Sequence, residues 1–92
     1  MRQIVPPRVV YLPHALAQTQ ERRIPLRLVE QVVDEPEQLL ETGHRKVAQS
    51  RYADHARGKE FLLRVFYEET EESRVVVSMY RTSKVAKYWR TS

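Results

Sequence analysis

The chain has 92 residues, with 16 Lys or Arg against 12 Asp or Glu, so its formal net charge is +4. This length predicts one domain with a small core and a shallow surface site, and the absence of cysteine excludes disulfides and thiolate metal sites. The spacing of its three histidines does not suit a helical metal site and no apolar run could span a membrane, so we expect a cytoplasmic protein without metal, cofactor or membrane partner.

The N-terminal half predicts a short extended segment followed by two helices. Residues 1–8 are expected to form an extended arm, and Val9–Leu12 is a short run that could form a strand. Good helix formers after a proline predict a helix over His14–Arg23, and a second proline starts another over Leu26–Glu35. The expected buried stripes are Leu12, Ala15, Leu16 and Thr19 in the first helix and Leu28, Val29, Val32 and Val33 in the second.

The C-terminal half predicts strands and a short final helix. The expected strands are Gln38–Thr42, Arg45–Tyr52, Glu60–Tyr67 and Arg74–Tyr80, with a loop over 53–59, an acidic turn over 68–73 and a helix over Ser83–Trp89. The strand Glu60–Tyr67 has one face of Phe61, Leu63, Val65 and Tyr67 and another of Leu62, Arg64 and Phe66, and its apolar content on both faces predicts a central position in the sheet. The expected inward residues are Val75, Val77 and Met79 in the next strand, and Val85 and Trp89 in the final helix. This order predicts an α+β domain with an antiparallel three- to four-stranded meander sheet and helices on one face.

The basic residues are unevenly distributed. Twelve of them are arginines, and no acidic residue follows Glu72. The final segment interleaves cations with Tyr80, Tyr88 and Trp89, a pattern that suits a phosphate-bearing ligand such as RNA. An ordinary strand followed by a solvated helix explains the same pattern. The acidic turn and the basic C-terminus also suggest head-to-tail contacts between copies of the chain.

The best candidates for chemistry lie where the last strand ends. Tyr80, Arg81, Ser83 and Lys84 leave the sheet together, and His14 begins the first helix, where the helix dipole favours a neutral imidazole. Two cations and a proton-transfer group would suffice for metal-free RNA cleavage by the 2′-hydroxyl. The predicted catalytic residues are therefore His14, Tyr80, Arg81 and Lys84. The alternative is that His14 is a surface residue and the others have no catalytic role.

Further polar residues are candidates for contacts with nucleic acid. They are Arg22, Arg45, Arg51, Arg64, Ser83 and Lys87. Arg22 could instead complement a helix C-terminus, and the pair Arg45 and Arg51, which share a strand face, could protect a sheet edge. Arg64 stands among apolar neighbours, so it should either pair with a carboxylate or line a groove on the open sheet face.

Two segments carry a family resemblance. The opening HALAQTQERRIP (His14–Pro25) and the closing YRTSKVAKYWR (Tyr80–Arg90) resemble a bacterial family of small uncharacterised domains, over about residues 11–90. That family is similar to the BrnT-type toxins, which belong with the RelE/ParE-like group. Gln18 stands where the family commonly has arginine, and Arg23 where it usually has glycine.

The resemblance implies a small sheet with helices on one face and a ribonuclease inhibited by a partner antitoxin. By position it points to His14, Arg22, Arg81, Ser83 and Lys84. Two hypotheses remain open. The first is a toxin-like, metal-free endoribonuclease, and the second is a non-catalytic module of the same fold that binds protein or nucleic acid.

Overall fold

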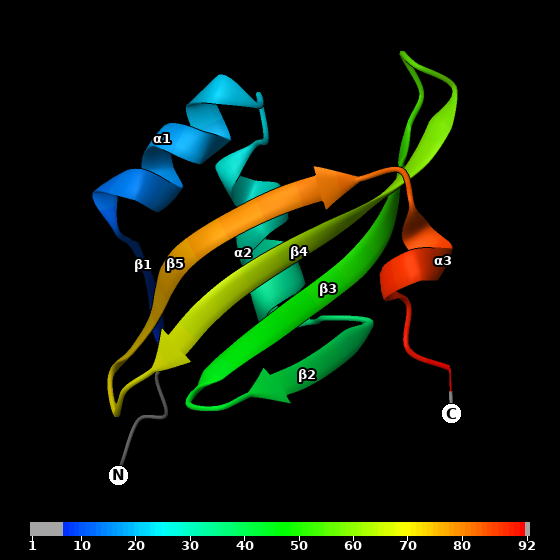
Figure 1. The fold of residues 1–92 in the computed structure, drawn as a ribbon. Helices are drawn as coiled ribbons and strands as arrows, with labels where there is room; N and C mark the ends of the chain where they lie inside the picture. The colour runs from blue at the N-terminus through cyan, green and yellow to red at the C-terminus, as the bar shows by residue number, and fades with distance from the viewer. Residues whose placement is uncertain (1–6, 92) are drawn as a thin grey trace, which may run out of the picture.

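The computed structural model describes residues 7–91, which form five strands and three helices (Figure 1). In chain order these are β1 Arg8–Tyr11, α1 Pro13–Glu21, α2 Leu26–Asp34, β2 Gln38–Thr42, β3 Arg45–Asp54, β4 Lys59–Glu69, β5 Ser73–Thr82 and α3 Val85–Tyr88. The predicted α+β class is confirmed. Of the extended arm expected over residues 1–8, residues 1–6 lie outside the described part of the chain, and Arg8 begins β1.

All five strands belong to one mixed sheet, in the order β1-β5-β4-β3-β2. Strands β2 to β5 form the predicted antiparallel meander, but β1 adds a fifth strand that runs parallel to β5. The prediction of a three- to four-stranded meander was therefore wrong. A four-residue run carries little periodicity of its own, and β1 becomes a strand by pairing with residues more than sixty positions away.

Helices α1 and α2 cover one face of the sheet and build the core against it. Val29, Val32 and Val33 of α2 are buried as predicted, whereas Leu28 of the same stripe is half-buried. Strand β4 has the predicted central position, and its face toward the helices is buried. In α1 only Ala15 and Thr19 are buried. The other two predicted members of its stripe, Leu12 and Leu16, are 42% and 38% exposed, because α1 packs at the β1–β5 edge of the sheet and covers it with one narrow line of residues.

A β-bulge changes which residues of β5 face the core. Phe66 pairs with Ser78, whereas the next residue of β4, Tyr67, pairs with Val76, so one residue of β5 is left over. The alternation therefore shifts at this point, and Val76 is buried instead of the predicted Val75 and Val77, which are only half-buried. Met79, beyond the bulge, is buried as predicted.

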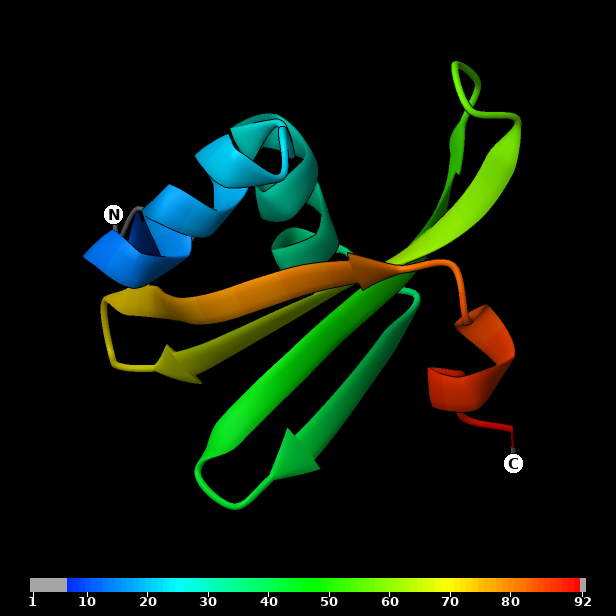
Figure 2. The ribbon, with the colours of Figure 1, turned by 45° about the horizontal axis from the view of Figure 1, so that its top comes forward.

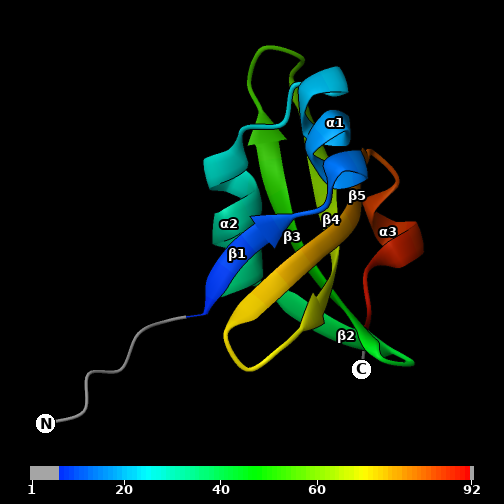
Figure 3. The same ribbon diagram turned by 90° about the vertical axis from the view of Figure 1, so that its left-hand side faces the viewer.

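The third helix lies on the opposite face of the sheet from α2, which corrects the prediction that all helices share one face (Figure 3). It is one turn long, shorter than the predicted Ser83–Trp89, and none of its residues is buried. Val85 and Trp89, which were expected to anchor it, are only half-buried. We call the sheet face under α3 the open face.

Strands β3 and β4 are longer than predicted and continue together beyond the rest of the sheet. The expected loop over 53–59 is reduced to a turn at residues 55–58, because residues 53, 54 and 59 belong to the two strands. Because β2 begins opposite Gln49 and β5 ends opposite Leu62, residues 51–61 project as a two-stranded arm (Figures 1 and 2).

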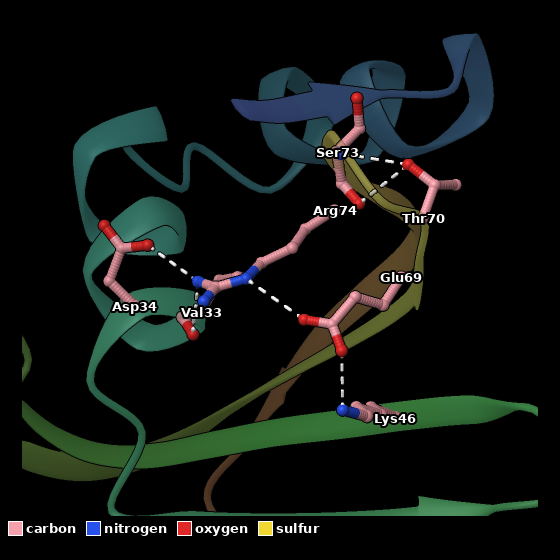
Figure 4. A network of polar contacts seen from close by, with 7 residues as sticks. All are labelled: Val33, Asp34, Lys46, Glu69, Thr70, Ser73 and Arg74. Atoms are coloured by element: carbon pink, nitrogen blue, oxygen red, sulfur yellow. Dashed lines mark hydrogen bonds and ion pairs between the residues drawn. The ribbon is translucent and has the colours of Figure 1, made fainter. Parts of the chain in front are cut away.

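A polar network at the other end of the sheet attaches α2 to three strands (Figure 4). The Arg74 guanidinium donates to the Val33 carbonyl (3.3 Å) and to the Asp34 carboxylate (2.9 Å), and its Nε lies 3.7 Å from Glu69. Glu69 also accepts a hydrogen bond from Lys46 (2.7 Å). Glu69, which the sequence placed in the exposed acidic turn, therefore helps to attach α2 to the sheet.

Candidate nucleic-acid interface

Four polar side chains form a straight row across the open face. Gln38 pairs with Gln49, Gln49 with Arg64, and Arg64 with Tyr80, so each of four adjacent strands contributes one residue at the same level. Cross-strand neighbours on one face of an antiparallel sheet lie about 5 Å apart, within reach of direct hydrogen bonds. We call these four residues the polar row.

Hydrogen bonds run along the polar row in both directions from Arg64, which is a donor on each side. Arg64 Nε donates to Gln49 Oε1 (2.8 Å), and Gln49 Nε2 donates to Gln38 Oε1 (2.7 Å). On the other side, Arg64 Nη1 donates to the Tyr80 hydroxyl (2.6 Å). Gln49 is completely buried although it is polar, and these bonds compensate for the loss of water. The row therefore holds the guanidinium of Arg64 in one orientation.

Aromatic rings surround this guanidinium. The Arg64 Cζ atom lies 4.6 Å from the Tyr88 ring centroid, 5.4 Å from that of Phe66 and 5.7 Å from that of Tyr80. Of the two possibilities raised by the sequence, pairing with a carboxylate is not found among residues 7–91, and Arg64 lies on the open face. Arg64 is only half-buried, and its Nη2 donates to no acceptor within the same residues. A positioned guanidinium with a free donor is suited to binding an anion.

The polar row also holds the C-terminal segment in place. Gln49 Nε2 donates to the Tyr88 carbonyl (3.1 Å), while Gln38 donates to the carbonyl of Arg90 (2.6 Å) and accepts from its N–H (3.0 Å). The two bonds between Gln38 and Arg90 resemble those of a strand pair. The row thus places Tyr88 over Arg64.

The surroundings of Tyr88 lower the pKa of its phenol. A hydrogen bond with the Tyr80 phenol is the main cause that lowers the pKa of Tyr88, and the positive charges of Lys87 and Arg64 add to it. The Lys87 Nζ atom lies 5.3 Å from the Tyr88 ring centroid. Two cations, of which Arg64 is held by hydrogen bonds and Lys87 is exposed, therefore lie close to two phenols, Tyr80 and Tyr88, on the open face. We call these four residues the open-face site.

The structure does not bring the four predicted catalytic residues together. Tyr80 and Arg81 are adjacent in β5, so their side chains lie on opposite faces of the sheet. Tyr80 belongs to the open-face site, whereas Arg81 lies on the helix side, 5.5 Å from the Phe61 ring centroid. Lys84 is exposed in the link to α3. His14 is exposed on α1, on the helix side of the sheet.

Two side chains of α1 complete the edge of β5. Strand β1 pairs with β5 only as far as Val76, so Met79 has no strand neighbour on that side within residues 7–91. The Gln18 side chain accepts from the Met79 N–H (3.0 Å), and the Arg22 guanidinium donates to the Met79 carbonyl (3.2 Å). Arg22, which was predicted to contact phosphate, instead uses its guanidinium to hold the end of α1 against β5.

The remaining predicted contacts differ in their surroundings. Arg45 lies 3.6 Å from the Glu68 carboxylate, and Arg51 both pairs with Glu37 (3.2 Å) and stacks on Trp89 at 4.3 Å from the ring centroid. Their charges are thus balanced locally, as at a protected sheet edge. The other candidates are exposed at or near α3, namely Ser83 and Lys87.

Sequence reasoning missed two glutamines and Tyr88 as members of the site. Gln38 and Gln49 have no distinctive motif, and only strand register shows that they are level with Arg64. Tyr88 was noticed among the C-terminal aromatic residues, and its position next to Lys87 in a basic segment was the available signal.

A separate cavity of about 290 Å³ lies between α2 and β3. Its polar wall includes Glu37, Ser50 and Arg51. These three residues already form hydrogen bonds with one another, so they are not free to bind a ligand. Within residues 7–91, no three His, Asp or Glu side chains gather as ligands for a metal ion. No helix among these residues has the length and apolar character needed to cross a membrane.

Comparison with known proteins places the chain in a family. No curated protein and no solved structure matches it. A family model described as a domain of unknown function (DUF4258) matches residues 11–86, which is most of the chain and includes the central residues of the polar row. The chain therefore belongs to the DUF4258 family.

Proposed function

We propose that this chain is a toxin-like protein that binds RNA on the open face and cleaves it without a metal ion. The observation that supports this proposal is Arg64, a guanidinium held by Gln49 and Tyr80, with no carboxylate partner in the described chain and a free Nη2 donor. A phosphate is the ligand whose geometry and charge fit such a group. The resemblance to BrnT-type and RelE-like toxins is consistent with this choice and adds an antitoxin as the expected partner.

The residues around Arg64 suit each step of the cleavage. Tyr88, with its lowered pKa, accepts the proton of the 2′-hydroxyl, and the 2′-oxygen then attacks the adjacent phosphorus. Arg64 stabilises the negative charge that develops on the phosphate oxygens. The bond to the 5′-oxygen breaks, and this oxygen takes a proton from the Lys87 ammonium group. The products are a 2′,3′-cyclic phosphate and a free 5′-hydroxyl.

A second function is supported by the bonds of the polar row itself. Gln38 and Gln49 use their side chains to hold residues 88–90, so the row could serve only to attach α3. In that case the chain would be a non-catalytic module that binds RNA or protein. Catalysis is favoured because attachment of α3 does not require a cation with a free donor beside a phenol of lowered pKa.

The test is cleavage of a fluorescently labelled single-stranded RNA by the purified chain in the presence of EDTA. We expect a cyclic-phosphate product and a rate that rises with pH up to the pKa of Tyr88, which lies below the ordinary phenol value of 10.0. Tyr88→Phe should bind RNA normally but lose about 10²- to 10⁴-fold in cleavage rate. Arg64→Gln should lose both affinity and rate.

Arg27→Gln is the matched control, since it removes one exposed cation from α2, on the other side of the sheet. It should leave both measurements unchanged. Cleavage by Tyr88→Phe at the wild-type rate would refute the catalytic role of Tyr88. Binding without any cleavage by the wild-type chain would support the non-catalytic module.

A further inference from the structure

A second group of cations lies on the helix side of the arm, across the sheet from Arg64. Tyr52 and Phe61 stack there with ring centroids 5.9 Å apart and an interplanar angle of 27°. Two guanidinium groups flank Phe61, with Arg57 at 6.0 Å and Arg81 at 5.5 Å from its ring centroid. Phe61 is 8% exposed, so the rings form a rigid base that positions these cations rather than a free stacking surface.

The charges on this side of the arm are mostly unbalanced. Arg81 forms no ion pair with any carboxylate of residues 7–91. Arg57 lies 3.6 Å from Asp54, but its side chain remains 55% exposed. Lys59, which pairs with Asp54 in the sheet register, is also exposed. This side of the arm thus carries three cations, of which only Arg57 has a carboxylate within ion-pair distance, and this suits a ligand with more than one negative charge.

The open-face site and the cations of the arm, Arg57, Lys59 and Arg81, lie on opposite sides of the sheet near the edge where β5 ends. Strand β5 ends at Thr82, and the chain then turns onto the open face to form α3, with Ser83 and Lys84 exposed in the turn (Figure 2). The arm beyond this point is two strands wide, and neighbouring strands are about 5 Å apart. A flexible ligand can pass around this edge from Arg81 to Arg64, with Lys84 along its path.

We propose that the RNA is single-stranded and bends around the end of β5, contacting Arg57 and Arg81 on the helix side, Lys84 at the edge and Arg64 on the open face. This inference rests on the proposed function and adds its substrate class. A double helix is too stiff and too wide to follow a turn around an edge one sheet thick. A single strand has a charged backbone that can follow the cations in order.

The test compares binding of single-stranded and hairpin 2′-O-methyl RNA, which lacks the attacking hydroxyl, by fluorescence anisotropy over a range of salt concentrations. We expect tighter binding of the single strand. Arg57→Gln/Arg81→Gln should reduce the slope of log affinity against log salt by about 1.4, since each phosphate contact with a single strand contributes about 0.7. Arg57→Lys/Arg81→Lys should retain the slope because it keeps both charges.

The control is Arg8→Gln/Arg27→Gln, which removes the same charge from exposed positions of β1 and α2, away from the proposed path, and should not change the slope. Thermal unfolding of each variant checks that the chain is folded. An unchanged slope in the folded Arg57→Gln/Arg81→Gln variant would overturn this inference, and so would equal affinity for hairpin and single strand. If the wild-type chain still cleaved RNA in either case, the proposed function would stand. Absence of both RNA binding and RNA cleavage would overturn both.

Discussion

Replacing Arg23 with glycine should stabilise the protein. Arg23 follows α1 and has a positive φ of 53°, a left-handed conformation that favours glycine. Its N–H donates to the Gln20 carbonyl (3.3 Å), and the N–H of Ile24 donates to the Thr19 carbonyl (2.9 Å). These two bonds form a Schellman motif in which Arg23 holds the position normally taken by glycine.

The size of the effect follows from two opposing contributions. An L-residue pays about 1–2 kcal/mol for the left-handed conformation, whereas glycine loses more backbone entropy on folding, at a cost of about 0.5–1 kcal/mol. Arg23 is exposed and its side chain makes no bond to residues 7–91 that would be lost. We therefore expect Arg23→Gly to raise the free energy of unfolding by about 0.5–1 kcal/mol, or the melting temperature by roughly 2–8 °C.

Urea and thermal unfolding followed by circular dichroism measure this change. Arg23→Ala is the control, since it removes the same charge but retains the left-handed cost, and it should stay close to the wild type. Arg22→Gly should instead destabilise the protein, because Arg22 has a φ of −99° and donates to Met79. Equal gains for Arg23→Gly and Arg23→Ala would show that charge rather than backbone conformation limits stability here, and the reasoning would be wrong.

Three further predictions concern the framework around the site. Gln18→Leu should lower the free energy of unfolding by about 1–3 kcal/mol in urea titrations, because the Met79 N–H loses its acceptor; an unchanged midpoint would contradict this. Arg74→Leu should cost about 2 kcal/mol by separating α2 from the strands, and it should raise hydrogen exchange in α2 more than in α1. Hydrogen bonds from Arg51 and Lys46 lower the pKa values of Glu37 and Glu69 below the usual 4.5. Their stabilisation should therefore be present above about pH 4.5 and lost as the pH falls through the folded-state values, and Glu37→Gln/Glu69→Gln should flatten this acid dependence.

Periodicity along the chain was sufficient for the elements that bury one regular face. The valine stripe of α2 predicted the helix and its buried valines, because a side chain's direction there depends only on its position in the element, and the apolar content of both faces of β4 predicted its central position. The same reasoning failed on β5, where a bulge shifts the alternation. The run Val9–Leu12 was recognised as a possible strand, but its parallel pairing with the distant β5 was not predicted.

The candidate site was predictable in its residue types but not in its arrangement. Composition alone pointed to the basic, aromatic end of the chain, and the isolated charge of Arg64 within β4 indicated a special environment. That Tyr80 and Arg81 face opposite sides follows from the pleat of the strand, and was available from the sequence. Only strand register places Gln38 and Gln49 beside Arg64, because hydrogen bonding between strands depends on how distant segments align.

The sequence by itself determined the α+β class, the second helix, the central strand and the chemical character of the C-terminal end. The tertiary structure decided the fifth strand, the position of α3 on the open face and the separation of the predicted cations onto two sides of the sheet. The physical reason is that helix and strand periodicity are local properties of the chain. Register, bulges and the face on which a segment docks depend instead on contacts between residues far apart in sequence.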